Sequence, residues 1–479
     1  MGNYKEILKE ANYLLGNWVS SGSQMHTIYD KYSAEQLATV PFASPGEVAD
    51  AISFAASGRR ELAGWSAGKR AQHLERVACL LEARRDAFVD IIVREAGKPI
   101  GHARNEVDRG MTTLRNAAVE ATRFCGEVIP LDQGIGIGKT AFTKRIPVGI
   151  VAAITPFNFP LNLVLHKVAP ALAVGCPVIV KPALQSPLTA LALASLIEEA
   201  GYPKEVLQVF VCCNSSAEML VRDERVAMLS FTGSDEVGWQ LKSIAGKKKV
   251  ALELGGNAAM IVDETADIGK AASLACMGSY LYAGQICVST QRIFAVKSVF
   301  EEFKEAMIKE IALVKSGNPQ EEGVINGPLI SKAHAERVNV WVQEAIQQGA
   351  ELLAGARMLD PQRPIYAPTL LTKTLPGMKV RKEEVFGPVA VLEPVDDYQE
   401  AILRVNESRY GLQVGVFTNR VDRMHQAHDQ LEVGGVIIGG VPGFRVESMP
   451  YGGIKDSGLG REGIRYAMEE MTEPRLMVF

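Results

Sequence analysis

Residues 146–183 read IPVGIVAAITPFNFPLNLVLHKVAPALAVGCPVIVKPA, and this stretch decides the fold. Residues 146–155 and 177–181 are short apolar runs rich in β-branched side chains, which is typical of buried strands. The apolar stretch at 163–174 lies between them and is long enough for a helix. A strand, a helix and a second strand in this order predict a βαβ unit of a parallel sheet, with helices covering both of its faces.

The same alternation continues along the chain. A helical stretch at 188–200 is closed by Gly201, and strand-like runs follow at 206–211, 228–231 and 250–254 with helical segments between them. This pattern predicts a doubly wound α/β domain. Ligands of such sheets bind beyond the carboxyl ends of the strands, so polar residues at those ends are candidates for a site.

Two further regions flank this domain. Residues 48–123 have helical periodicity and form an entry region, while residues 258–430 form a second α/β region. No linker rich in Pro or Ser separates the two α/β regions, so we expect a hinge-like junction near Gly255 and Gly256. A cleft between two such domains is a usual place for a small-molecule site. The strands expected in the second region are 292–296, 390–392 and 414–417.

Length and composition are those of a globular protein with two or three domains. Of its 479 residues, 47% are hydrophobic and 22% are charged, so the chain can form substantial cores and is too apolar for long disorder. Its 51 Lys and Arg residues and 55 Asp and Glu residues give a net charge of −4. Because the chain has no excess of positive charge to attract nucleic acid or an acidic membrane, the expected partner is a small molecule.

Signals for export, membrane insertion and metal binding are not expected in this chain. Residues 1–15 carry four charged side chains where a signal peptide needs an apolar stretch, and the longest apolar run, 168–180, is too short to span a bilayer. The number of cysteines, seven, is odd, which argues against a full set of disulfides. Their spacing is not that of zinc ligands, which argues against structural zinc. We therefore expect a cytoplasmic protein without a metal site.

Cys287 is the first candidate for catalysis. It ends the sequence Gly284-Gln285-Ile286-Cys287 just before the strand at 292–296, which places a thiol on a short loop. An arbitrary free cysteine is more often a buried core residue than a nucleophile. Here a glycine and a polar residue precede the thiol, so backbone N–H groups can approach a thiolate or an oxyanion.

Glu253 is the second candidate, at the end of the apolar strand 250–254. A carboxylate at an edge normally points to solvent, but the neighbours of Glu253 are apolar. Burial there would raise its pKa, which suits a general base that acts on water near neutral pH.

Three more polar features end successive strands. Asn158 lies between aromatic residues and prolines, where a stiff loop could direct its N–H toward an oxyanion, although the same residues are compatible with a simple turn. Lys181 ends the next strand and could bind a ribose or a phosphate, although a solvated lysine is commoner there. The turn at 231–234 precedes a helix and could hold a phosphate. In contrast, the GIGIG at 134–138 lacks the spacing of a dinucleotide fingerprint.

With these residues in place, the chain resembles the aldehyde dehydrogenase superfamily over nearly its whole length. The motifs occur in the family order, so the match is highly specific. They are PFNFP at 156–160, KPA at 181–183, FTGS at 231–234, LELGGN at 252–257, GQIC at 284–287, EEVFGP at 383–388 and PYGGIKDSGLGREG at 450–463.

The resemblance implies a mechanism and a cofactor. Cys287 would attack the aldehyde carbon, while Asn158 and the backbone N–H of Cys287 would hold the oxyanion. After hydride transfer to the nicotinamide of NAD or NADP, Glu253 would activate the water that hydrolyses the thioester. The expected cofactor contacts are Thr155, Pro156, Phe157, Lys181, Ala183, Leu184, Phe231, Thr232, Gly233, Ser234, Glu384 and Phe386. Of these, Lys181 and Glu384 match ribose-binding positions, Gly233 and Ser234 match the pyrophosphate turn, and Phe157 and Phe386 bound the nicotinamide pocket.

One position departs from the family pattern. Many NAD-selective members carry Glu three residues after the strand-end lysine, where its carboxylate binds the adenosine ribose and repels a 2′-phosphate. This chain has Leu184 there. We therefore expect that NADP is usable, and the choice between NAD and NADP stays open.

Two arginines suggest the substrate. Arg109 and Arg445 match segments that border the substrate entrance in this family, together with Phe159. Either arginine alone is better explained as a solvated surface residue. Together, two guanidinium groups at a narrow entrance would select short aldehydes with a hydroxyl, carboxylate, phosphonate or sulfonate.

The whole-chain pattern is most similar to the lactaldehyde and glyceraldehyde dehydrogenase branch. Succinate semialdehyde dehydrogenase is an alternative within the family. A CoA-acylating enzyme is a second alternative, although such members commonly lack the Glu matched by Glu253. Outside enzymes, the alternative is a structural protein that binds the cofactor with a dead site.

The family also implies an architecture and a subunit arrangement. A Rossmann-like cofactor domain would comprise 1–123 and 143–254, and the α/β catalytic domain would comprise 255–435. A small bridging oligomerisation element would comprise 124–142 and 456–479, with 436–455 as a return segment. We accordingly expect a homodimer or homotetramer.

Overall fold

The first sheet carries the predicted parallel core. The computed structural model describes residues 3–479. Eight strands lie in the order β2-β1-β9-β8-β7-β10-β11-β21, and the five from β9 to β11 are parallel. Antiparallel strands close both edges. The strands are β1 (Asn12–Leu14), β2 (Asn17–Val19), β7 (Ile150–Ile154), β8 (Val178–Lys181), β9 (Leu207–Val209), β10 (Val226–Thr232), β11 (Lys249–Glu253) and β21 (Gly458–Leu459).

Helices cover both faces of this sheet, as a doubly wound fold requires. Successive side chains of a strand point to opposite faces. In β7, Val151 and Ala153 pack into a core with α2 to α6, whereas Ile150, Ala152 and Ile154 pack into a second core with α1, α7 and α8. The helices are α1 (Pro45–Gly64), α2 (Ala67–Ala83), α3 (Arg85–Ala96), α4 (Ile100–Arg123), α5 (Asn162–Val174), α6 (Leu188–Glu199), α7 (Asn214–Arg222) and α8 (Asp235–Ile244).

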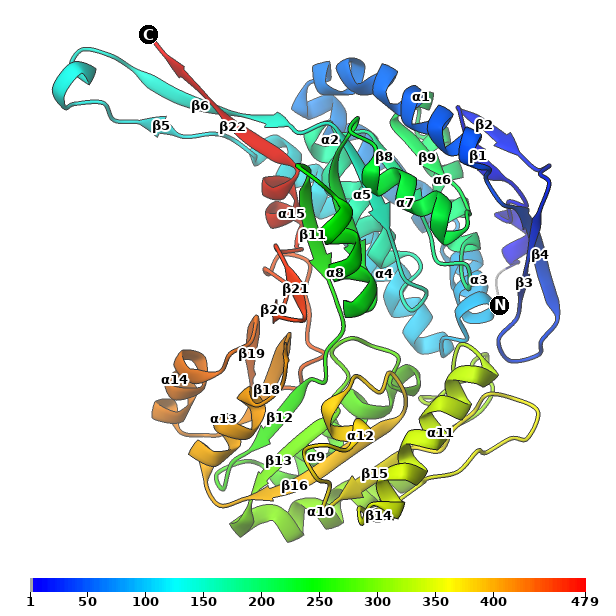
Figure 1. Ribbon diagram of the computed structural model, residues 1–479, viewed down its shortest axis with the longest axis vertical. Coiled ribbons are helices and arrows are strands. Elements are labelled where there is room, and N and C mark those ends of the chain that lie inside the picture. Colours follow the sequence, from blue (N-terminus) through cyan, green and yellow to red (C-terminus); the bar gives the residue numbers. More distant parts are fainter. Residues whose placement is uncertain (1–2) are drawn as a thin grey trace.

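A second sheet of seven strands forms the other half of the molecule, in the order β14-β15-β16-β13-β12-β18-β19 (Figure 1). All neighbours are parallel except β14 and β15. Its strands are β12 (Ala259–Val262), β13 (Arg292–Val296), β14 (Glu351–Ala354), β15 (Thr369–Thr372), β16 (Val389–Val395), β18 (Gln413–Phe417) and β19 (Gly435–Ile438). Its helices are α9 (Ile268–Tyr280), α10 (Lys297–Ala312), α11 (Lys332–Gln347), α12 (Lys379–Lys382), α13 (Tyr398–Asn406) and α14 (Val421–Gln430).

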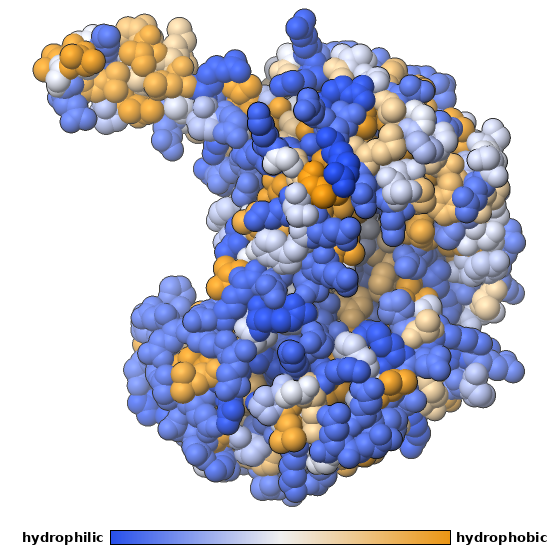
Figure 2. Space-filling view, viewed as in Figure 1, coloured by the Kyte–Doolittle hydropathy of each residue, from blue (hydrophilic) through white to orange (hydrophobic). Residues whose placement is uncertain are grey.

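An arm projects from the first half and carries the C-terminus at its edge (Figure 1). It is a three-stranded antiparallel sheet of β5 (Val128–Ile129), β6 (Ala141–Pro147) and β22 (Thr472–Val478). Its surface is predominantly hydrophobic (Figure 2). The exposed apolar side chains of the arm include Val128, Ile135, Ile137, Leu476, Met477 and Phe479.

The predicted elements are largely confirmed, with two differences. The run 146–155, predicted as one strand, is divided: residues 146–147 end β6 of the arm and β7 begins at Ile150. Pro147 has no N–H for a ladder, and Gly149 has a φ of +131°, so the chain turns there. The N-terminal strands, including the hairpin β3 (Met25–Tyr29) and β4 (Gln36–Pro41), were not predicted, and neither were β12, β14, β15 and β19 of the second sheet.

Membrane-spanning helices, metal-binding clusters and disulfides are absent from the described residues. None of the helices within residues 3–479 combines the length and apolarity needed to cross a membrane. The same residues contain no cluster of three His, Cys, Asp or Glu side chains arranged for a metal ion. All seven cysteines are free thiols.

Candidate active site

One cavity of about 620 Å³ gathers most of the predicted site residues. It lies where the carboxyl ends of β7, β10 and β11 face the second sheet. Thr155, Lys181, Ala183, Leu184 and Phe231 do not line it. The predicted residues in its wall are Arg109, Pro156, Phe157, Asn158, Phe159, Thr232, Gly233, Ser234, Glu253, Cys287, Glu384, Phe386 and Arg445.

The loop before Cys287 has an unusual backbone. Tyr282, Ala283 and Gly284 all have positive φ, at 53°, 53° and 66°. Non-glycine residues adopt this left-handed region rarely, so the surrounding contacts must hold them there. A Cβ on Gly284 would come within 2.2 Å of the Gly387 carbonyl oxygen, so the loop requires glycine at this position.

Buried hydrogen bonds fix the strained loop. The Tyr282 hydroxyl donates to the Ala96 carbonyl at 2.8 Å. The Gln285 side chain accepts from the Ile330 N–H at 2.8 Å and donates to the Pro328 carbonyl at 3.3 Å. These contacts hold the thiol of Cys287 in the cavity wall.

The Cys287 thiol is protonated in this environment. Burial raises the pKa of Cys287 to about 12, although its contact with Tyr451 acts in the opposite direction. The Cys287 Sγ lies 3.0 Å from the Tyr451 hydroxyl. A thiolate is the reactive form of cysteine, so aldehyde addition at this site has to include loss of the thiol proton.

Asn158 presents its amide toward the same loop. It lies just after β7, and its Nδ2 donates to the backbone oxygen of Gln285 at 2.9 Å. That acceptor fixes the orientation of the amide, because the opposite orientation would place two oxygens together. An amide nitrogen has two hydrogens, so one N–H of Asn158 is left for an oxygen in the cavity. Among the described residues its Oδ1 has no hydrogen-bond partner.

Glu253 is the last residue of β11, and only 4% of its surface is exposed. Burial raises the pKa of Glu253 well above its usual value, and the nearby Glu462 carboxylate raises it further. Arg445 and Lys167 act in the opposite direction. The pKa of Glu253 is therefore raised, as its position in an apolar strand predicts. A carboxylate whose conjugate acid has a raised pKa is a stronger base than an exposed carboxylate.

A network of charges, buried except for Arg109, whose side chain is 33% exposed, lines one end of the cavity. Arg109 donates to Glu447 Oε1 from Nε at 3.0 Å and from Nη2 at 2.7 Å, and His166 Nε2 lies 2.7 Å from Glu447 Oε2. Arg445 Nη2 is 3.1 Å from Glu462 Oε2 and 3.2 Å from His166 Nδ1. The solvated alternative is wrong for Arg445, of whose side chain only 10% is exposed.

The carboxylates of this network are ionised. Burial alone would raise the pKa of Glu447, but His166, Arg109 and Arg445 lower it far below its usual value. In the same way, Lys167, His166 and Arg445 overcome burial and lower the pKa of Glu462. The guanidinium groups at the entrance are therefore partly neutralised.

His166 and Tyr451 also line the cavity but were not singled out from the sequence. His166 lies on the largely apolar helix α5, beside Lys167 and four residues after Asn162, and all three side chains are buried. Polar residues at i and i+4 of an apolar helix share one face, and this spacing was the available signal. Tyr451 lies in the motif at 450–463, but its contact with Cys287 spans 164 residues of chain and could not be inferred from that motif.

The other end of the cavity fits a dinucleotide. Glu384 accepts from the Gly256 N–H at 3.0 Å, and burial raises the pKa of Glu384 to about 7. A Cβ at Gly255 would lie 2.4 Å from that carboxylate, and a Cβ at Gly233 would lie 2.5 Å from the Phe231 ring, so both positions require glycine for this packing. The rings of Phe157 and Phe386 meet edge to face at 5.8 Å in the wall.

The residues expected at the adenosine lie outside the cavity wall. Lys181 is buried at the end of β8, and burial lowers its pKa. The Leu184 side chain packs against the core that α2 to α6 share with β7, and its carbonyl oxygen is 2.7 Å from His26 Nε2. No carboxylate occupies position 184.

This site and fold define the class of protein. The sequence matches the aldehyde dehydrogenase family over residues 18–477, and the chain belongs to that family. It is an NAD(P)-dependent aldehyde dehydrogenase. The resemblance inferred from the motifs is confirmed.

Three relatives show the degree of similarity. The 3-sulfolactaldehyde dehydrogenase of Priestia megaterium is 41% identical over 480 residues, covering 100% of this chain and 99% of the relative. The crystal structure of aldehyde dehydrogenase 21 from Physcomitrella patens, in complex with its reaction product succinate, has a TM-score of 0.94 and 38% identity, with 98% of each chain covered. Glyceraldehyde-3-phosphate dehydrogenase GapN of Methanocaldococcus jannaschii, in complex with NADP, has a TM-score of 0.91 and 37% identity, covering 95% of this chain and 98% of that one.

Proposed function

We propose that this enzyme oxidises a short aldehyde carrying a polar or anionic group to its carboxylic acid, with Cys287 as the nucleophile. The observation that carries the proposal is the convergence of Cys287, Asn158 and Glu253 on one cavity, which a charged network closes at one end. A nucleophile, an oxyanion donor and a base each serve one step of thioester chemistry.

The first step is addition of the Cys287 sulfur to the aldehyde carbon. Because the thiol is protonated, its proton must leave to solvent as the C–S bond forms, so that Glu253 stays ionised for the later step. The aldehyde oxygen becomes an oxyanion, which the free N–H of Asn158 and the backbone N–H of Cys287 stabilise. The product is a thiohemiacetal.

The second half of the reaction releases the acid. A nicotinamide held beside Phe157 and Phe386 would supply the hydride acceptor, and loss of hydride from the thiohemiacetal carbon would leave Cys287 as a thioester. Glu253 then removes a proton from water, which attacks the thioester carbonyl and frees the thiol. The presence of Glu253 favours water over CoA as the acceptor, in line with hydrolysis and against the acylating alternative.

The cofactor contacts divide between the two halves of the molecule. Gly233 and Ser234, just before α8, would hold the pyrophosphate, while Glu384, which accepts from the Gly256 N–H, would accept from ribose hydroxyls. Lys181 would hold the adenosine ribose from outside the cavity wall. Since Leu184 supplies no carboxylate, NADP is accepted as well as NAD.

The charged network supports the proposed substrate class. Arg109, His166 and Arg445 place hydrogen-bond donors around one end of the cavity, and Phe159 gives that end an apolar side. Arg109 pairs with Glu447 and Arg445 pairs with Glu462, so the positive charge of each guanidinium is partly neutralised. The positive charge that remains favours small polar or singly anionic groups. The names of the relatives, which refer to sulfolactaldehyde, glyceraldehyde 3-phosphate and succinate, support this class and keep succinate semialdehyde as the second candidate.

The arm supports a homodimer or homotetramer. Its apolar side chains are exposed on a thin, projecting sheet, and a second copy of the chain would bury them. In this proposal 124–142 and 456–479 join subunits, 1–123 and 143–254 bind the cofactor, 255–435 carries the nucleophile, and 436–455 returns to the cavity. Sedimentation would test the subunit count, and the proposed cytoplasmic location is testable by cell fractionation.

An aldehyde panel tests the function. Purified enzyme is given lactaldehyde, glyceraldehyde, succinate semialdehyde, 3-sulfolactaldehyde, hexanal and benzaldehyde, each with NAD and with NADP, and the absorbance of the reduced nicotinamide is followed. We expect a higher kcat/KM for the short polar aldehydes without CoA. A preference for hexanal or benzaldehyde would refute the substrate class, and a strict need for CoA would refute hydrolysis.

A further inference from the structure

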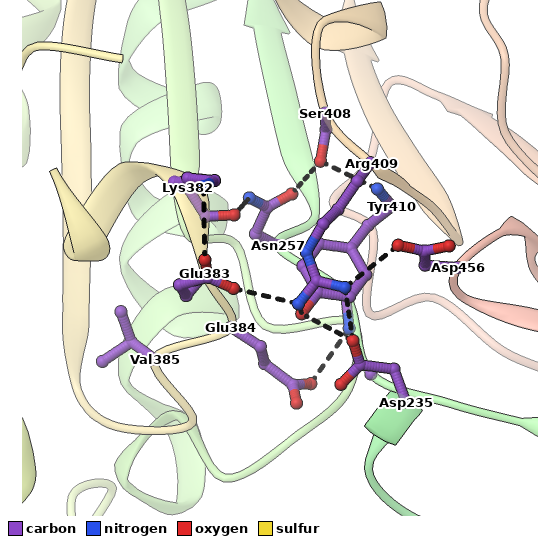
Figure 3. Close-up of polar contacts among 12 residues, drawn as sticks. Asp235, Asn257, Lys382, Glu383, Glu384, Val385, Ser408, Arg409, Tyr410 and Asp456 are labelled. Atoms are coloured by element: carbon purple, nitrogen blue, oxygen red, sulfur yellow. Dashed lines mark hydrogen bonds and ion pairs between the residues drawn. The ribbon is translucent and has the colours of Figure 1, made fainter. Parts of the chain in front are cut away.

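Arg409 lies at the centre of a cluster of acidic residues (Figure 3). Its guanidinium pairs with Asp235, with Glu383 at 2.9 Å and with Asp456 at 3.0 Å. The same group donates to the Tyr410 hydroxyl and stacks over the Tyr410 ring at 4.1 Å from its centroid. Arg409 therefore joins segments that lie 174, 47 and 26 residues away along the chain.

The acidic partners of Arg409 flank the proposed cofactor contacts. Asp235 directly follows Ser234 and begins α8 in the first half of the molecule. Glu383 directly precedes Glu384 in the second half, and Glu384 accepts from the Gly256 N–H. One guanidinium thus connects the turn for the pyrophosphate with the loop for the ribose.

A second set of contacts holds Arg409 in register with that loop. The Asn257 amide donates to the carbonyl oxygens of Arg381 and Lys382 at 3.0 Å each, and its oxygen accepts from the Ser408 hydroxyl at 2.6 Å (Figure 3). The residues before Glu383 and before Arg409 are therefore tied together through Asn257. Because these hydrogen bonds fix Arg409 relative to Glu383, the position of Asp235 is also fixed relative to the loop that carries Glu383 and Glu384.

The charges at this end of the cavity need a counter-ion. Asp235, Glu236, Glu383 and Glu384 all line the wall, although the cofactor brings a negatively charged pyrophosphate. Like charges in a partly desolvated site repel strongly. Arg409 pairs with two of these carboxylates directly and so reduces the repulsion.

We propose that Arg409 is a positioning residue for the cofactor: it fixes the separation between the turn at Ser234 and Glu384, and it neutralises carboxylates that would repel a pyrophosphate in this end of the cavity. This inference rests on the proposed function and assigns cofactor affinity to a residue that carries no part of the aldehyde chemistry. Loss of Arg409 should therefore weaken cofactor binding more than catalysis.

The ionisation of Glu384 gives the proposal a distinct signature. Burial raises the pKa of Glu384 and Asp235 raises it further, whereas the Gly256 N–H, Arg337 and Arg409 lower it. Without Arg409 the pKa rises from about 7, so more of Glu384 is protonated near neutral pH and cannot accept from a ribose hydroxyl. The loss of cofactor affinity should be larger at about pH 7 than at about pH 9.

The test compares Arg409→Gln with the control Arg404→Gln, which removes a half-buried guanidinium paired with Glu400 on α13 and with Glu407 just after it. Binding of NADPH is titrated by quenching of tryptophan fluorescence, and steady-state constants are measured for cofactor and aldehyde. For Arg409→Gln we expect the Kd and the cofactor KM to rise about tenfold, with kcat at saturating cofactor and the aldehyde KM changed less than about threefold. The control should match the unmodified enzyme.

A double variant separates positioning from general damage. Adding Glu383→Gln to Arg409→Gln removes one of the uncompensated charges and should recover part of the NADPH affinity, although it restores no ion pair. An Arg409→Gln enzyme with unchanged NADPH affinity, or with equal losses for cofactor and aldehyde at both pH values, would overturn the proposal. If the unmodified enzyme binds NADPH but oxidises no aldehyde, the proposed function fails while this binding test still stands.

Discussion

Replacing Tyr451 with Phe is expected to slow the attack of Cys287 on an aldehyde by about four- to fifteenfold near neutral pH. The Tyr451 hydroxyl is 3.0 Å from the Cys287 Sγ, and this contact lowers the pKa of the buried thiol more than the nearby Arg445 does. The ring itself supports Arg445, whose guanidinium stacks 3.9 Å from the ring centroid. Phe keeps that ring and removes only the hydroxyl.

The magnitude follows from one hydrogen bond to a charged sulfur. Such a bond contributes about 1.5–3 kcal/mol, which is equivalent to a change of about one to two pKa units. At a fixed pH well below the pKa, the thiolate fraction falls by about ten- to a hundredfold. A thiolate of higher pKa is also more nucleophilic, with a Brønsted coefficient of about 0.45, which offsets nearly half of the loss on a logarithmic scale.

The assay follows the thiol directly. The rate of alkylation by iodoacetamide is measured against pH for the unmodified enzyme and for Tyr451→Phe, together with kcat/KM for the best aldehyde. Tyr398→Phe is the control, because it removes a hydroxyl that donates to the Arg423 carbonyl far from the thiol. If Tyr451→Phe shows the same dependence of alkylation on pH as the unmodified enzyme, Tyr451 does not stabilise the thiolate and the reasoning is refuted.

Three further variants test the proposed roles. Glu253→Gln should give a burst of reduced cofactor followed by slow turnover, and it should abolish the rise of hydrolysis with pH that tracks the raised pKa of Glu253; a steady-state rate and pH profile like those of the unmodified enzyme would contradict this. Leu184→Glu should shift the ratio of kcat/KM values toward NAD by about tenfold, because its carboxylate would face a 2′-phosphate, and an unchanged ratio would oppose it. Arg445→Leu should raise the KM for an acidic or hydroxylated aldehyde about tenfold more than that for propanal, whereas equal changes would remove Arg445 from substrate selection.

The central sheet was predictable because burial on two faces leaves a strong sequence pattern. The runs that became β8 and β13 are short, apolar and bounded by turn residues, and the structure places them within a residue of the prediction. The strands β1 to β4 gave no such signal, because they lie at an edge or in a separate hairpin and mix polar with apolar side chains. The division at Gly149 depends on a single backbone conformation within an apolar run.

Some residues of the site could be predicted from short sequence motifs, whereas others could be recognised only from contacts in the folded structure. Asn158 and Cys287 could be identified because each lies in a short contiguous motif, whose neighbouring residues indicate a loop and resemble the family. His166, Tyr451 and Arg409 depend on segments brought together from distant parts of the chain, so their contacts could be recognised only in the folded structure. Likewise, the pairing of Arg445 with Glu462 could not be inferred from either local sequence.

The most direct test of the account is the identity of the covalent intermediate. Glu253→Gln is mixed with the best aldehyde and cofactor, quenched in acid within the burst, digested and analysed by mass spectrometry. We expect one acyl group, of the mass of the oxidised substrate, on the peptide that contains Cys287, and none in Cys287→Ala. An unmodified Cys287 peptide during a full burst, or acylation of a different residue, would contradict it.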